Sequence, residues 1–212
     1  MRRMMMTILV ATAASAAVLA QMQTPARPAS PVGTAAIQVG DWKPGDTNDA
    51  RIKAGKWIEV AYGRPLKRGR ESVFGAGADY GKTVNAGSPV WRAGANVSTR
   101  LKTEVPLTFG TTTVPAGEYS LFIELKGPAA WTMILSTHQA QTTYDPNDKV
   151  KLWGSYGYTP DKDVLRVPMK VEALPYSMEQ LTFVFADVTG TSGALRLMWD
   201  TTTASVAFKV AK

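Results

Sequence analysis

Three short segments place arginine, tryptophan and asparagine where they could hold an anion or a carbonyl group. The segments are Gly63-Arg64-Pro65, Gly69-Arg70 and Trp91-Arg92-Ala93-Gly94-Ala95-Asn96. Arginine presents five N–H donors in a planar fork and stacks on aromatic rings. Glycine permits tight turns, and asparagine bonds to turn backbone or adopts the left-handed conformation. We therefore take as candidate ligand-binding residues Arg64, Arg70, Trp91, Arg92 and Asn96.

Two arrangements of the segment 91–96 follow from these residue types. In one, Arg92 bonds turn carbonyls or a carboxylate and fixes a rigid corner of the fold. In the other, Arg92 and Asn96 lie in a cleft and hold an anionic or carbonyl group of a ligand. The sequence leaves both arrangements open.

Metal and nucleophilic chemistry would have few residues to use. The chain has one histidine, His138, and no cysteine, whereas a zinc site takes three or four ligands from Cys, His, Asp and Glu. A lone histidine in a polar loop is expected to face solvent. The oxygen-rich run 145–148 lacks the EF-hand pattern and is typical of Asx turns. We predict neither a metal site nor a cofactor.

Carboxylates and aromatic residues offer two further possibilities. A glycoside hydrolase would need two carboxylates that converge from different strands, and the candidates are Glu59, Glu118, Glu124 and Asp163. Trp153, Tyr156 and Tyr158 alternate with glycines in one loop. That loop either packs against the fold or offers a platform on which a sugar ring could stack.

The elements that must position these residues read as β-strands. Leu181, Phe183 and Phe185 share one face of a strand, and Val206 and Phe208 share one face of another, which is the period of a half-buried strand. Turn residues separate the predicted strands, and 200–203 is predicted to link the last two as a hairpin. The strands are predicted at 57–62, 90–92, 99–103, 107–113, 118–125, 131–136, 164–174, 180–188, 193–199 and 205–210. The sequence thus predicts an all-β fold, an antiparallel β-sandwich of jelly-roll-like arrangement.

The first residues have the layout of an export signal. A basic start at Arg2 and Arg3, an apolar run and a small-residue site ending at Ala20 are typical of a secretory signal peptide. We expect a signal peptide at 1–20, a flexible proline-containing leader at 21–38 and one β-sandwich domain at 39–212. This predicts a secreted or periplasmic protein that has no stable membrane insertion after cleavage.

The charge pattern bears on the partner. The chain has 24 basic and 17 acidic residues, a formal net charge of +7. A nucleic-acid-binding protein concentrates such charge on one element, whereas only Arg64, Lys67, Arg68 and Arg70 cluster here. We therefore expect a small molecule or a glycan as partner, and no nucleic acid.

Taken together, several motifs resemble the bacterial family known as domain of unknown function 2911, over about 40–209. They are 63–65, Gly69-Arg70, 73–75, 80–82, 90–96 with Thr99, 115–122, Trp131-Thr132 and 163–167. The resemblance implies a secreted or periplasmic protein without an established activity, and it adds no catalytic residue. The chain departs from the family pattern at Val97, where an acidic residue is common, and by inserted residues at 83–89.

The sequence favours a domain that binds a small polar or carbohydrate ligand through the five candidate residues. A carboxylate-dependent hydrolase that uses the same cleft is the main alternative. A structural, envelope-associated protein whose arginines are satisfied internally is the third.

Overall fold

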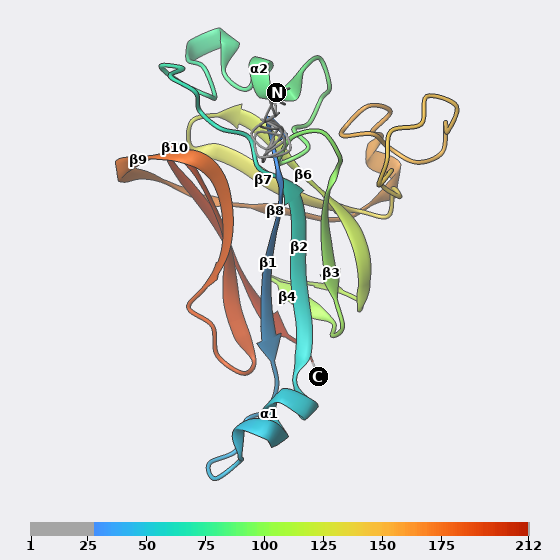
Figure 1. Ribbon diagram of the computed structural model, residues 1–212, viewed down its shortest axis with the longest axis vertical. Helices are drawn as coiled ribbons and strands as arrows, with labels where there is room; N and C mark the ends of the chain where they lie inside the picture. The colour runs from blue at the N-terminus through green and yellow to red at the C-terminus, as the bar shows by residue number, and fades with distance from the viewer. Residues whose placement is uncertain (1–27, 212) are drawn as a thin grey trace, which may run out of the picture.

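A computed structural model describes residues 28–211 of the chain (Figure 1). The predicted signal peptide at 1–20 and the first part of the predicted leader lie outside the described residues. The described chain forms two antiparallel sheets, so the all-β class and the sandwich prediction are confirmed. The jelly-roll part of the prediction is not confirmed.

The larger sheet has six strands in the order β1-β2-β3-β6-β7-β8, and every neighbouring pair is antiparallel. Its strands are β1 (Val32–Val39), β2 (Lys56–Gly63), β3 (Thr99–Thr103), β6 (Gly117–Gly127), β7 (Ala130–Ser136) and β8 (Asp163–Pro168).

The smaller sheet has four strands in the order β5-β4-β10-β9. They are β4 (Leu107–Phe109), β5 (Thr112–Val114), β9 (Lys170–Ala186) and β10 (Ser192–Val210). The helices are short: α1 (Asn48–Ala54), α2 (Lys82–Asn85) and two 3-10 turns, Gly77–Asp79 and Pro160–Lys162. Within residues 28–211, no helix is long and apolar enough to cross a lipid bilayer.

One hydrophobic core fills the space between the two sheets. Ile58 and Leu101 project into it from the larger sheet, and Leu197 and Phe208 project from the smaller one. The alternation predicted for the last two strands is confirmed, because Leu181, Phe183, Val206 and Phe208 are all buried. Burial of alternate side chains is the main force that holds two sheets face to face.

The leader predicted for 21–38 differs from the structure over its last seven residues, which belong to β1. All eight residues of β1 pair with β2, from Val32 opposite Gly63 to Val39 opposite Lys56. Val39 is buried, and Ala35 and Ile37 pack against the core. The gain in backbone hydrogen bonds and burial therefore places this segment in the sheet.

The hairpin turn predicted at 200–203 is wrong. Strand β10 continues through these residues and stays paired with β9, with register shifts on both sides of Asp200. Asp200 has a φ of 54°, so the turn-like residues form a bulge that bends a long strand. The real turn between β9 and β10 lies at 187–191. The single strand predicted at 107–113 is instead a small hairpin formed by β4 and β5.

Candidate functional site

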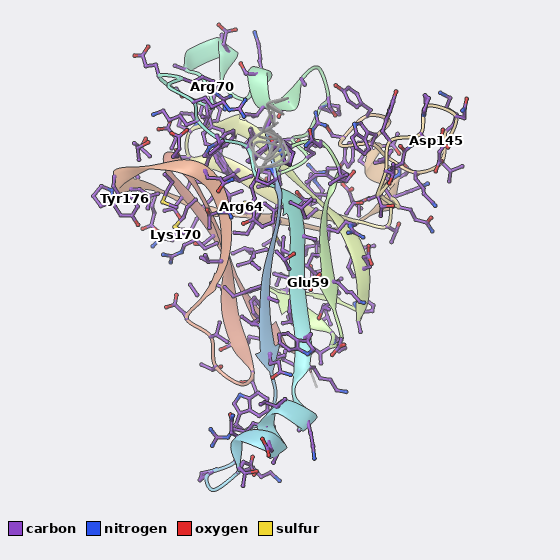
Figure 2. All side chains as sticks on the ribbon, in the orientation of Figure 1. Glu59, Arg64, Arg70, Asp145, Lys170 and Tyr176 are labelled. Carbon is purple, nitrogen blue, oxygen red and sulfur yellow. The ribbon has the colours of Figure 1, made fainter. Side chains whose placement is uncertain are left out.

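Helix α2 lies at the end of the sandwich opposite α1 (Figure 1). Residues in and just after α2 line a cavity of about 340 Å³. We call it the arginine cavity. Four of the five candidate residues line it, namely Arg70, Trp91, Arg92 and Asn96, together with Trp153, Tyr156 and Trp199. Figure 2 shows Arg70 at this end of the molecule. The structure thus brings together residues that come from three separate loops and from β10.

Close backbone packing holds the 91–96 segment in place. The Trp91 backbone exchanges hydrogen bonds of 2.8 and 2.9 Å with Ile123 of β6. A Cβ atom on Gly63 would lie 2.0 Å from the carbonyl oxygen of Ala95, and one on Gly94 would lie 3.0 Å from the oxygen of Gly63. Only glycine at both positions allows the turn to sit directly on the end of β2.

Trp91 belongs to the core and forms the floor of the cavity. Its side chain is only 1% exposed. Its ring is stacked with Trp199 at 6.1 Å between centroids and meets Phe74 and Trp131 edge to face. Its indole N–H donates to the carbonyl of Gly94 at 3.2 Å. The main role of this side chain is therefore to support the turn from below.

Arg92 bonds a turn carbonyl, as the first arrangement requires, and it also lines the cavity. Its Nη1 donates to the Asn96 carbonyl at 2.8 Å, which closes the turn. Its guanidinium lies 5.5 Å from the ring centroid of Tyr156. Within residues 28–211 it has no carboxylate partner, and its Nε and Nη2 atoms make no hydrogen bond. The half-buried guanidinium therefore fixes the corner, and its Nε and Nη2 donors stay without a partner among the described residues.

Arg70 lies over the face of Trp199, with 5.2 Å from its Cζ atom to the ring centroid. Its Nε and Nη2 donate to the carbonyls of Lys67 and Leu66 at 2.9 and 2.8 Å. These contacts fix the guanidinium plane. Within residues 28–211, Arg70 forms no ion pair and its Nη1 makes no hydrogen bond. A second preoriented cation thus lines the same cavity.

Asn96 completes the turn at the exposed rim of the cavity. Its backbone is left-handed, with a φ of 64°, which asparagine tolerates better than most residues. Its side-chain amide donates to the carbonyl of Ser30 at 3.4 Å. Of the candidate residues it is the one that the structure leaves most open to solvent.

Arg64 does not line the cavity. Its Nε donates to the Leu181 carbonyl at 3.3 Å and its Nη2 to the Thr182 hydroxyl at 3.2 Å. Its aliphatic stem lies against Gly33, where a Cβ would be 2.2 Å from Cδ. These contacts join β1, the end of β2 and β9, so this arginine has a structural role.

The aromatic loop at 153–158 packs one of its aromatic side chains against the fold and leaves two at the cavity. Ser98 and Ser88 hydroxyls donate to backbone carbonyls of the loop at 152–155, which holds it against the 91–96 segment. Tyr156 is 54% exposed and lines the cavity with the partly buried Trp153. Tyr158 instead packs inward against Phe122.

Tyr158 anchors this loop to β8. Its hydroxyl donates to Asp163 at 2.6 Å and accepts from Arg166 at 3.1 Å. Burial and the neighbouring carboxylate of Asp163 raise the pKa of Tyr158 well above its usual range. The phenol therefore stays protonated and remains a donor to Asp163, which explains the 163–167 motif as an anchor.

The four carboxylates considered for a hydrolase do not meet in the arginine cavity. Glu118 pairs with Arg100, while Glu124 and Asp163 both pair with Arg166. Glu59 lies on the outer face of the larger sheet beside Glu104. Among the described residues that line the cavity, none is acidic.

His138 is buried at 6% exposed, contrary to the expectation that it faces solvent. Its Nε2 bonds the hydroxyl of Thr159 at 3.1 Å and accepts from the Thr159 N–H at 3.3 Å. Its carbonyl accepts from Ser120 of β6 at 2.7 Å. These bonds draw the loop inward. In the part of the chain that the structure describes, no three His, Cys, Asp or Glu residues cluster as metal ligands.

The Asx turns predicted at 145–148 are confirmed, because the carboxylates of Asp145 and Asp148 each accept a hydrogen bond from the backbone N–H two residues further on.

Sequence reasoning missed one wall of the cavity. Thr83, Val84 and Ala86, in and just after α2, line it. They belong to 83–89, the stretch that the resemblance implies is inserted, and this expected insertion is the signal that could have found the wall.

Comparison with known proteins gives one match. The family model described as "Protein of unknown function (DUF2911)" matches residues 43–208, and neither a curated protein nor a solved structure matches. The matched range contains every motif that carried the resemblance. The chain therefore belongs to the DUF2911 family of proteins of unknown function.

Proposed function

We propose that this domain binds a small acidic carbohydrate in the arginine cavity, in the secreted or periplasmic setting that its predicted signal peptide indicates. The observation that carries the proposal is the pair of guanidinium groups, Arg70 and Arg92, which line one cavity without an acidic side chain among its described lining residues. Two backbone carbonyls hold Arg70 and one holds Arg92, each guanidinium lies near an aromatic ring, and each keeps N–H donors. A ligand carboxylate would supply the missing partner through charge-assisted hydrogen bonds.

The shape and lining of the cavity favour a sugar over a simple inorganic anion. Its volume of about 340 Å³ lies at the lower end of ligand sites, which run from roughly 300 to 1,000 Å³. Trp153 and Tyr156 offer aromatic surface, and Thr83 and Asn96 offer polar groups. A hexuronic acid matches this set, because it combines one carboxylate, several hydroxyls and an apolar ring face.

The two alternatives receive less support. Acid–base hydrolysis of a glycosidic bond needs a pair of carboxylates about 5–10 Å apart, and the cavity offers no such pair from the described residues. The structural alternative accounts for Arg64, whose donors bond β9. It leaves unexplained why Arg70 and Arg92 face an open cavity.

Titration calorimetry with galacturonic acid tests the proposal. We expect the protein to bind galacturonic acid and to bind galactose at least about tenfold more weakly, since the neutral sugar lacks the carboxylate. Replacing Arg92→Gln removes hydrogen bonds to a charged group, which contribute about 1.5–3 kcal/mol, so affinity should fall by about tenfold to a hundredfold. Arg92→Lys keeps the charge but loses the planar fork, so its affinity should lie between those of the wild-type protein and Arg92→Gln.

Arg51→Gln on α1 is the matched control, because Arg51 is an exposed arginine at the other end of the molecule. Its affinity should equal that of the wild-type protein. Equal binding of galactose and galacturonic acid, or an affinity that Arg92→Gln leaves unchanged, would contradict the proposal.

A further inference from the structure

A second and larger cavity, of about 840 Å³, lies beside the arginine cavity. We call it the lysine cavity. Trp153 and Tyr156 line both cavities, so these two side chains form a ridge between them. Figure 2 shows Asp145, one of the residues that line the second cavity, at the same end of the molecule as Arg70. A ligand that crosses the ridge would occupy both.

The loop at 141–151 that lines the lysine cavity is built as a closed unit. Its ends are tied by a parallel bridge between Ala140 and Leu152. Gln141 is 5% exposed, and its amide nitrogen lies 3.1 Å from each of the carbonyls of Asp145, Asp148 and Lys151. Its amide oxygen accepts from the Asp145 N–H at 2.9 Å. A loop closed at its neck and filled by its own side chain is an Ω-loop, a type often used for function.

Exposed apolar side chains gather at this cavity. Tyr144, Val150 and Tyr156 line it and are 59%, 73% and 54% exposed. The Tyr144 ring also meets Trp153 edge to face at 5.3 Å between centroids. Aromatic surface left open around a hollow is typical of a ligand site.

The charges of the lysine cavity favour an anionic ligand. Lys149, Lys151 and Lys162 line it, against Asp145 and Asp148. Backbone N–H groups of the loop hold both carboxylates, and those bonds lower the pKa of Asp148. Within residues 28–211, Lys151 and Lys162 form no ion pair. Two lysines are thus left for a ligand.

From these observations we infer that one extended ligand, an acidic oligosaccharide, spans both cavities across the Trp153/Tyr156 ridge. The inference rests on the proposed function, since the arginine cavity would hold the first acidic unit. Each further unit brings a carboxylate for Lys151 or Lys162 and an apolar ring face for the aromatic ridge. An acidic peptide would bring the carboxylates but no sugar ring to stack on the ridge.

The test is a calorimetric series with galacturonic acid, its dimer, its trimer and its tetramer. In the wild-type protein we expect affinity to rise by at least tenfold from monomer to tetramer. The double variant Lys151→Gln/Lys162→Gln should lose this rise and keep the affinity for the monomer. Lys53→Gln/Lys170→Gln removes the same charge from exposed positions elsewhere, and should keep the rise.

The outcomes separate the two proposals. Equal affinity for monomer and tetramer would overturn the extended ligand and leave the monomer site standing. Tetramer binding that is lost in the lysine variant but unaffected by Arg92→Gln would overturn the role of the arginine cavity. A glutamate tetrapeptide that binds as tightly as the tetramer would overturn the carbohydrate assignment.

Discussion

Replacing Trp91→Ala should lower the free energy of unfolding by about 3–5 kcal/mol, the usual cost of deleting a fully buried large aromatic side chain. The indole is 1% exposed and is surrounded by Phe74, Trp131 and Trp199. Alanine would leave a void in this aromatic cluster and would remove the hydrogen bond to the Gly94 carbonyl. Urea denaturation measures the loss.

Trp57→Ala is the matched control for this variant. Trp57 is 48% exposed on β2, so its removal should cost within about 1 kcal/mol. A Trp91→Ala protein that unfolds at the same urea concentration as the wild type would show that the indole is not part of the core. Its role would then be contact with the ligand, as its sequence position first suggested.

Replacing Gly63→Ala should be among the most disruptive small substitutions in the described chain. The added Cβ would lie 2.0 Å from the Ala95 carbonyl oxygen and 2.8 Å from its carbon. Both neighbours are backbone, so neither can move aside alone. Overpacking typically costs about 1–3 kcal/mol and occasionally more, and we expect a loss at the upper end of this range.

Since Ala95 belongs to the turn that lines the arginine cavity, the Gly63 variant should also bind galacturonic acid more weakly at temperatures where it is folded. Gly127→Ala provides the control, because a Cβ at that position meets nothing within 4 Å. If Gly63→Ala had the same melting temperature as Gly127→Ala and bound galacturonic acid with wild-type affinity, the backbone contact between β2 and the turn would be refuted.

Local pattern was enough to predict the strands that bury alternate side chains. Leu181 and Phe183 are buried on one face of β9, and Val206 and Phe208 on one face of β10. This succeeds because a half-buried strand must repeat its apolar residues every second position. The pattern says nothing about where a strand ends, and for that reason β10 was read as two strands.

Long-range pairing decided what local pattern could not. Strand β1 mixes β-branched residues with glycine and alanine, and its pairing with β2 fixes its conformation. Thr202 and Thr203 read as a turn, yet they pair with Ala173 and Glu172 of β9. In both cases the paired residues lie outside a short sequence window, so their contribution is invisible there.

The candidate site was partly predictable for a chemical reason. Arginines next to glycines in loops mark places where a tight backbone brings donors together, and Arg70, Arg92 and Asn96 do meet at one cavity. Arg64 has the same local pattern, but its donors face β9. The lysine cavity was not predicted, because it depends on Gln141 filling the interior of its own loop.

The most direct measurement is a crystal structure of the protein grown with galacturonic acid. We predict the sugar in the arginine cavity, with its carboxylate about 2.7–2.9 Å from guanidinium nitrogens of Arg70 and Arg92 and its ring against Trp153 or Tyr156. A sugar bound elsewhere, a carboxylate directed into solvent, or an empty cavity at saturating concentration would contradict this account.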